Sequence, residues 1–261
     1  MKAIFRRIHP TDTDSAPPTT PPAYTPNSIS ASSSTVPSSS LPITVVELFQ
    51  SQGCNSCPPA NDNLISLASS SQVQTDYLLL TYHVTYWDYL GWTDTFGSSA
   101  FDARQRDYVR RMSLRSAFTP QVIVNGRASG VGSRKSDLER LLGDGSAGSQ
   151  LPVSVSVVTG DGEDTIVTVN ASGLSSDAEP LEVVVAWFDP ERQDVQITRG
   201  ENKGETLPHL NVVKSVERVG LIEEKEGEKV FVLDRRQDLG VRGAVLVQKG
   251  HGGWVVGAAR I

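Results

Sequence analysis

Both cysteines of this 261-residue chain stand in one C-x-x-C motif, Cys54-Asn55-Ser56-Cys57, and this pair limits the possible folds more than any other feature. Cysteines this close can form a small reversible ring, but they cannot cross-link distant parts of a chain. The preceding run, residues 43–49, is apolar and β-branched, as in a buried strand. Pro58 and Pro59 follow, with φ already suited to a first helical turn. The predicted local order is strand, C-x-x-C and helix.

Cysteines at a helix N-terminus are candidates for thiol chemistry. The helix dipole favours an anion there and can lower a thiol pKa from about 8.5 to roughly 3.5–7.5. Half of a zinc site would look the same, but structural zinc usually has four Cys or His ligands and the chain has no second C-x-x-C. A dithiol is the leading interpretation, with a metal site and a non-reactive pair left open.

Composition narrows the class of protein. A net charge of −6 gives no reason to expect nucleic-acid binding, and no apolar run is long enough to predict a transmembrane segment. The start carries Lys2, Arg6 and Arg7 without an apolar stretch after them, so we expect no secretory signal peptide. We expect an intracellular, cytoplasmic location, with a mitochondrial one left open. In a reducing cytosol the pair would be catalytic or redox-sensing.

The pattern along the chain indicates two domains after a tail. Residues 1–42 are dominated by Ser, Thr and Pro, which predicts disorder. Residues 43–143 give the order strand, helix, strand, helix, hairpin, helix, with an aromatic insert at 84–100. The hairpin signal is Asn125-Gly126, and the last helix has a capping box at 136–139 and ends at Gly143. This is the order of a thioredoxin-like α/β domain.

A different pattern follows a Gly-rich linker at 144–150. Residues 151–261 contain seven or eight short alternating or apolar runs separated by turn residues. We predict an all-β sandwich-like domain. The Gly-rich segment at 200–204 is predicted to be a hairpin tip or a loop in this domain.

Long motifs connect the chain to a known family. The segments that carry the likeness lie at 45–60, 83–92, 103–106, 119–122, 200–204 and 211–213. In these segments the chain resembles a thioredoxin-like family that is catalogued only as a domain of unknown function. The resemblance covers roughly residues 43–261. It implies a thioredoxin-like fold and a thiol site, and it does not indicate a substrate. Many relatives look exported, whereas we expect no signal peptide in this chain.

The resemblance also suggests roles for individual residues. Cys54, the first and normally the exposed sulfur, is the expected nucleophile, and Cys57 resolves the mixed disulfide. By analogy with thioredoxin-like proteins, the Thr119-Pro120 bond is expected to be cis and to face the sulfurs, with the Thr119 backbone binding an extended substrate. We place Trp87 and Trp92 of the aromatic insert, together with Gln121, at the substrate-binding surface. Ordinary loop packing would explain the aromatic residues equally well.

Charged residues near the motif have alternative interpretations. His83 ends the second strand and is an acid–base partner of Cys57, a metal ligand or a structural histidine. Asp88 orients it or caps a turn. In thioredoxins a buried acidic residue on the first strand assists the resolving cysteine. Glu47 is expected to point away from that position and to be a structural, hydrogen-bonding carboxylate. Five arginines form a helix face that we expect to be solvated, namely Arg104, Arg106, Arg110, Arg111 and Arg115.

The leading functional prediction is a thiol-disulfide oxidoreductase acting on a protein or small-molecule thiol or disulfide. Its redox group is the Cys54/Cys57 disulfide, so no organic cofactor is expected. A Cu(I)-binding module that uses Cys54, Cys57 and His83 is the alternative, because thiolates suit Cu(I). A non-catalytic protein-interaction module built on the β domain is the third. Substrate identity and oligomeric state stay open.

Overall fold

The fold is known from a computed structural model, which describes residues 43–70, 76–147, 153–159, 164–172, 179–223, 227–234 and 240–261. The tail predicted at 1–42 lies outside the described residues. The first part of the chain contains β1 (Thr44–Gln50), α1 (Pro58–Ala68), β2 (Tyr77–His83), η1 (Asp88–Leu90), α3 (Ser99–Arg111), β3 (Gln121–Val124), β4 (Ala128–Gly130) and α4 (Lys135–Ser146). The second part contains β5 (Ser154–Thr159), β6 (Asp164–Asn170), β7 (Leu181–Asp189), β8 (Gln193–Gln196), β9 (Thr206–His209), β10 (Val212–Ile222), β11 (Glu228–Asp234), β12 (Arg242–Lys249) and β13 (Val255–Arg260).

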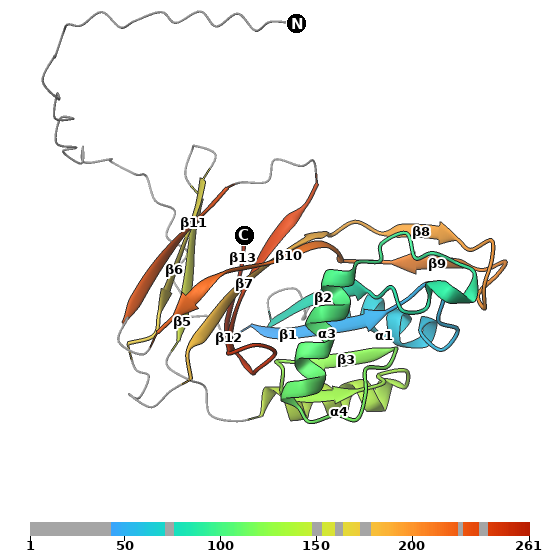
Figure 1. The fold of residues 1–261 in the computed structure, drawn as a ribbon, viewed down its shortest axis with the longest axis horizontal. Coiled ribbons are helices and arrows are strands. Elements are labelled where there is room, and N and C mark those ends of the chain that lie inside the picture. Colours follow the sequence, from blue (N-terminus) through green and yellow to red (C-terminus); the bar gives the residue numbers. More distant parts are fainter. Residues whose placement is uncertain are drawn as a thin grey trace, which may run out of the picture. The chain divides into compact units, whose positions relative to one another are not determined.

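One eight-stranded sheet joins the two parts. Its order is β13-β12-β7-β10-β2-β1-β3-β4, with β1 and β2 parallel and β1 and β3 antiparallel. Strand β10 pairs with β2 through Val212 and Thr81, and with β7 along most of its length. The fold is therefore mixed α/β, with a large central sheet and few helices (Figure 1). The boundary predicted at 144–150 stays a prediction, since strands from both sides of it share this sheet.

Helices cover both faces of the β1–β2 region. Side chains alternate along β1, so Val45 and Phe49 face a cluster with α3, whereas Val46 and Leu48 face a cluster with α1 and α4. The α3 cluster continues across β7, β10 and β12, so its apolar core runs through both parts of the chain. A second, three-stranded sheet, β11-β6-β5, packs its apolar residues against β7 and β12. No helix within the described ranges is both long and apolar enough to cross a membrane.

The β3–β4 hairpin confirms the Asn125-Gly126 signal. Both residues have positive φ, 50° and 62°, as the tight turn requires. The Asn125 side chain also accepts a hydrogen bond from the backbone N–H of Val45 (2.7 Å) and donates one to the carbonyl of Gly145 (3.2 Å). The predicted limits of α4 were wrong. It begins at Lys135 without a side-chain cap and continues past Gly143, because Gly145 packs directly against Val124.

Arg104 corrects the prediction of a fully solvated arginine face. It is 8% exposed, and its guanidinium donates to Glu47 Oε1 (2.7 Å), Gln248 Oε1 (3.0 Å) and Tyr108 Oη (2.9 Å). Glu47 also accepts a short hydrogen bond from Tyr108, in agreement with its predicted structural role. Burial lowers the pKa of Arg104, but Glu47 together with Tyr108 and Tyr82 outweighs that effect and holds the pKa above its usual value. This network ties α3 to β1 and β12.

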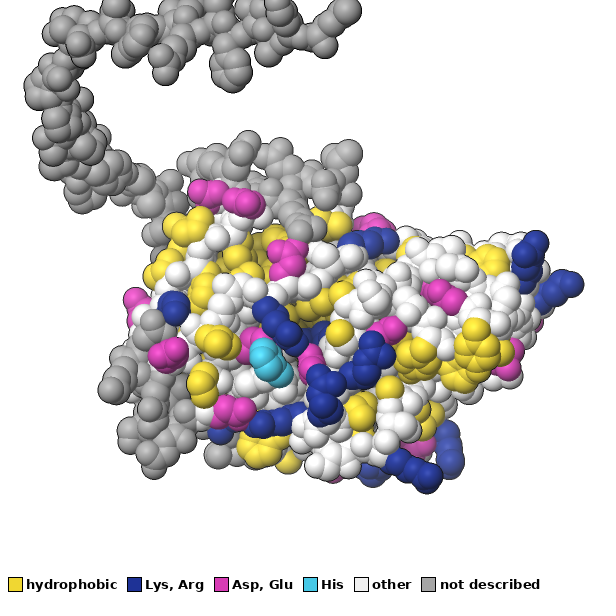
Figure 2. Space-filling model, viewed as in Figure 1, with side chains coloured by type: hydrophobic (Ala, Val, Ile, Leu, Met, Phe, Trp, Pro, Cys, Tyr) yellow, Lys and Arg dark blue, Asp and Glu magenta, His cyan; other side chains and the backbone are white. Residues whose placement is uncertain are grey.

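Two of the other arginines predicted on this face, Arg110 and Arg111, are paired at the surface. Arg110 contacts Asp107, which also contacts Arg218, and Arg111 contacts Glu179. Figure 2 shows Lys and Arg side chains interspersed with Asp and Glu on this face. Exposed pairs of this kind contribute little to stability, so the face carries mixed charge and no strong positive field.

Replacing Arg104 by alanine should lower the free energy of unfolding by about 3 kcal/mol, because Glu47 would remain buried without its partner. Arg106→Ala, on an exposed position of the same helix, is the control and should stay within about 0.5 kcal/mol of the wild type. Urea denaturation followed by circular dichroism measures both. Equal effects would show that the buried network contributes no special stability.

Candidate active site

Cys54 and Cys57 form a disulfide in the loop between β1 and α1. Cys57 is the N-cap of α1, and its carbonyl accepts from the N–H groups of Ala60 (3.1 Å) and Asn61 (3.2 Å). Both cysteines are 2% exposed, so the expectation that Cys54 would be the exposed sulfur is wrong for this oxidised state. The exposed residues of the motif are the two between them, Asn55 and Ser56.

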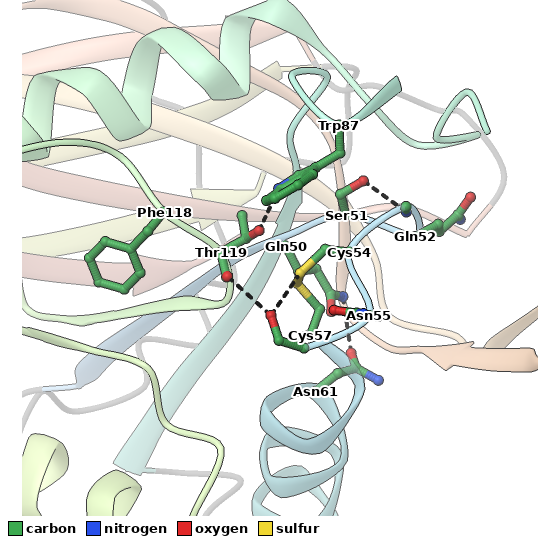
Figure 3. Close-up of a disulfide and its surroundings, with 12 residues drawn as sticks. Gln50, Ser51, Gln52, Cys54, Asn55, Cys57, Asn61, Trp87, Phe118 and Thr119 are labelled. Atoms are coloured by element: carbon green, nitrogen blue, oxygen red, sulfur yellow. Dashed lines mark hydrogen bonds between the residues drawn. A yellow bond between two sulfur atoms is a disulfide. The ribbon is translucent and has the colours of Figure 1, made fainter. Parts of the chain in front are cut away.

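The Thr119-Pro120 peptide bond is cis, as predicted, and lies beside the disulfide. The Ser56 hydroxyl links the two elements, because it lies 3.3 Å from Cys54 Sγ and donates to the carbonyl of Thr119 at 3.5 Å (Figure 3). The Thr119 hydroxyl accepts from the indole N–H of Trp87 (2.6 Å). The structure thus brings four of the predicted site residues together: Cys54, Cys57, Thr119 and Pro120.

The aromatic insert packs along the motif loop. Trp87 stacks on Tyr89 and lies against Gly53, where an added Cβ would be 3.4 Å from the Trp87 Cβ. Trp92 donates its indole N–H to Gln52 Oε1 (2.9 Å). Both tryptophans are partly exposed, so each contacts the loop and also reaches solvent. Their predicted contact with substrate stays a prediction.

Gln121 follows Pro120 and turns its side chain into the protein interior. Its side chain is fully buried, accepts from Gln105 Nε2 (2.7 Å) and donates to Ser129 Oγ (2.9 Å). The amide is therefore used inside the protein. Its predicted role in substrate binding stays a prediction.

His83 is buried beside a carboxylate, but the partner is Asp94 and not Asp88. Asp94 Oδ2 lies 2.8 Å from His83 Nδ1 and also accepts from the Gln52 N–H (2.7 Å). Burial raises the pKa of Asp94, yet His83 and the backbone N–H groups of Gln52 and Phe96 lower it by more, and the net direction is down. Asp88 accepts from the Asp94 N–H (3.1 Å), as a turn residue does. Asp94 thus connects His83 to the motif loop.

A hairpin from the second part of the chain reaches the motif, which the sequence did not reveal. We call residues 190–211, which contain β8 and β9, the arm; it extends beside the motif end of α1 (Figure 1). At its tip, buried Asn202 donates to the carbonyls of Gln52 (2.8 Å) and Cys54 (3.1 Å). Glu201 accepts from the Asn55 N–H at 3.4 Å. The Gly-rich pattern at 200–204 indicated a loop, but no local signal showed what it contacts.

The base of the arm closes the site behind Cys57. His209 is 2% exposed and its ring centroid lies 4.7 Å from that of His83. Asn61 donates to the carbonyl of Pro208 (2.7 Å). Burial and the neighbouring His83 lower the pKa of His209 to about 3, so this ring is neutral at neutral pH.

The described residues contain no group of three or more His, Cys, Asp or Glu side chains arranged to hold a metal ion. The ring nitrogens of His83 face Asp94 and the Gln50 amide. The predicted set Cys54, Cys57 and His83 is therefore not assembled as a metal site in this oxidised form.

Comparison with known proteins gives a family and a fold. A family model described as a protein of unknown function, DUF1223, matches residues 45–248. The crystal structure of a protein from Agrobacterium tumefaciens is 30% identical, covers 85% of this chain and 95% of that one, and has a TM-score of 0.67. HBP35 of Porphyromonas gingivalis is 12% identical over 84% of this chain and 74% of that one, with a TM-score of 0.57, a likeness of fold alone. No curated protein matches.

Asn202→Ala should lower the free energy of unfolding by about 2 kcal/mol, because two buried hydrogen bonds to the motif loop are lost. It should also speed hydrogen exchange of the amides at 52–57, measured by mass spectrometry. The control is Lys203→Ala at the exposed neighbouring position, which should change neither. Unchanged exchange in Asn202→Ala would contradict the anchoring role of the arm tip.

The neutral state of His209 predicts a pH dependence. Unfolded His209 binds a proton below pH 6.5, whereas folded His209 does so only near pH 3, so stability falls as the pH is lowered through this window. Between pH 6.5 and 5 this single group should cost about 1.5 kcal/mol. His209→Phe should lose that part of the slope in urea titrations at several pH values. An identical slope in the variant would refute the assignment.

Proposed function

Since the chain belongs to the DUF1223 family, whose function is unknown, we propose its activity from the site itself: a thiol-disulfide oxidoreductase that uses the Cys54–Cys57 pair. One observation carries the proposal. The disulfide stands at the start of α1 and faces a cis X-Pro bond, and the Ser56 hydroxyl connects Cys54 to the carbonyl before that proline. The chemistry needs only the two thiols and a reducing or oxidising partner.

The arrangement of residues 43–146 supports a thioredoxin-like fold for this part of the chain. The sheet order β2-β1-β3-β4, with β1 and β2 parallel and β3 antiparallel to β1, agrees with the order expected for that fold. The C-x-x-C lies where β1 leads into α1, at the carboxyl end of a strand, where α/β proteins commonly build sites. We assign the thioredoxin-like architecture on this basis.

Helix α1 supplies favourable electrostatics for a thiolate. Pro58 and Pro59 occupy its first positions, and its first turn holds no acidic residue. The positive end of the helix dipole therefore acts on the two sulfurs without a nearby carboxylate from that turn. A thiolate in such a place forms at lower pH than a free cysteine and is the reactive form.

The proposed reaction is a pair of thiol-disulfide exchanges. The Cys54 thiolate attacks one sulfur of a substrate disulfide; a bond from Cys54 to that sulfur forms, and the second substrate sulfur leaves as a thiolate. Cys57, as a thiolate, then attacks Cys54, and the first substrate sulfur leaves in turn. The substrate gains two electrons and becomes two thiols after protonation, while the protein becomes the disulfide. A thiol reductant restores the dithiol, and the reverse sequence oxidises a dithiol substrate.

The Thr119 carbonyl is the proposed acceptor for the backbone of an extended substrate. Ser56 occupies it in the free protein, but at 3.5 Å this hydrogen bond is at the long limit and is easily replaced. Trp87 fixes the Thr119 side chain, which leaves the carbonyl directed toward Ser56 and the disulfide. Trp87 and Trp92, partly exposed beside the loop, would form the wall against which the substrate packs.

Insulin reduction with dithiothreitol as the electron donor tests the proposal. Cys54→Ser should reduce the rate to that without protein, and Cys57→Ser should trap glutathione on Cys54 as a stable mixed disulfide that is visible by mass. Arg106→Ala, a surface substitution, is the control and should match the wild type. Wild-type activity in Cys54→Ser would exclude this mechanism.

A further inference from the structure

A buried ring nitrogen behind the disulfide lacks a hydrogen-bond partner. Nε2 of His209 is one of four buried side-chain atoms without a partner among the described residues. Native proteins pair nearly all buried polar atoms, so such an atom calls for an explanation. Its neighbours decide whether it is a donor or an acceptor.

The orientation of the Asn61 side-chain amide is set by a backbone carbonyl. Pro208 O can only accept, so the Asn61 atom that lies 2.7 Å away is the amide nitrogen Nδ2. The other side-chain atom of Asn61, Oδ1, therefore faces Gln50 and accepts from its Nε2 at 3.0 Å. This orients the Gln50 amide, with its NH₂ group toward the two histidines.

The orientation of Gln50 then sets the proton on each ring. Gln50 Nε2 lies 3.3 Å from His83 Nε2 and 3.4 Å from His209 Nδ1. One of its two N–H bonds points to Asn61, so the two rings share the other. Because an amide nitrogen cannot accept, a ring N–H at either position would face a donor, and both ring atoms are therefore unprotonated. His83 accordingly carries its proton on Nδ1, toward the Asp94 carboxylate at 2.8 Å. Neutral His209 carries its proton on the remaining nitrogen, Nε2. The atom without a partner is thus an N–H donor.

Cys57 and His209 line the same cavity. The cavity measures about 10 Å³, room for one water molecule, and it is lined by Gln50, Ser51, Cys57, Pro58, Asn61, Leu207, Pro208 and His209. Apart from Cys57 and His209, none of these side chains ionises. A disulfide sulfur is a weak acceptor, whereas a thiolate is a strong one.

We propose that His209 is the hydrogen-bond donor that stabilises the Cys57 thiolate of the reduced protein, directly or through one water in this cavity. The inference rests on the proposed exchange reaction. In the resolving step the Cys57 thiolate attacks Cys54, the Cys54–Cys57 bond forms, and the bond from Cys54 to the substrate sulfur breaks. The electron pair of that bond leaves with the substrate thiolate. His209 keeps its proton and transfers none.

The surroundings of His209 suit a neutral donor. Besides Cys57, the titratable groups that face it are His83 and Asp94, and in the oxidised protein burial together with His83 keeps its pKa at about 3. Phe96 packs edge-on against the ring, with centroids 5.4 Å apart. In the oxidised protein His209 is therefore neutral at the pH of thiol exchange, and its N–H is available as a donor.

The test measures the pKa of Cys57 in a Cys54→Ser background, where it is the only cysteine, by thiolate absorbance. Adding His209→Phe should raise that pKa by about one unit, a tenfold weaker acid. His209→Gln, which keeps an N–H donor, should restore part of the shift. His251→Gln, at a 61% exposed histidine paired with Glu182, is the control and should leave the pKa unchanged.

An unchanged pKa in folded His209→Phe overturns the inference. If that variant does not fold, nitrogen NMR of the unsubstituted protein decides: Nε2 of His209 should be protonated, and its proton resonance should move downfield on reduction. An unprotonated Nε2 or an unmoved resonance overturns the inference as well. Wild-type exchange with glutathione is measured separately, so its absence would reject the proposed function without affecting the hydrogen-bond result.

Discussion

The pairing of β10 with β2 is the contact on which the arrangement of the site depends. It is short, a single register pair between Val212 and Thr81 with the Thr81 N–H donating to the carbonyl of Asn211 at 3.0 Å. It nevertheless merges the strands of the second part of the chain into the sheet that carries the cysteines. The arm directly precedes β10, so the same pairing places Asn202 and His209 beside the motif loop.

The sequence predicts those features of the fold and the site that depend on neighbouring residues, and it misses those that depend on residues far apart in the chain. The strand before the motif, the prolines after it and the Asn125-Gly126 turn are local features, and each predicted its element. Arg104 was misjudged by residue type, although its spacing from Phe101 and Tyr108 already places it on their helix face. The contact of Asn202 with Gln52 spans 150 positions, and no pattern in a single sequence encodes such a partner. Asp94 was missed because its loop returns to His83 only in three dimensions.

The disulfide is enclosed by loops more than by helices and strands. The aromatic insert, the segment before Pro120 and the arm tip each contribute a hydrogen bond to the motif or to its neighbour, through Trp92, Thr119 and Asn202. Loops are less stable than the sheet that carries them, so local opening of these segments requires less free energy than disturbing β1 or α1. Access to the sulfurs can therefore change through opening of these loops while β1 and α1 stay folded.

In the free protein the Ser56 hydroxyl donates a hydrogen bond to the Thr119 carbonyl, the group proposed to bind the substrate backbone. In the proposed reaction, a substrate that takes the place of Ser56 on this carbonyl binds only molecules in which Ser56 has turned away, so its apparent affinity is the intrinsic affinity multiplied by the population of that state. Because this hydrogen bond is long, the loss of affinity is small, and a substrate that makes several backbone contacts compensates for it. In the proposed reaction, the rotation of one hydroxyl group inside the C-x-x-C would thus set part of the cost of binding substrate.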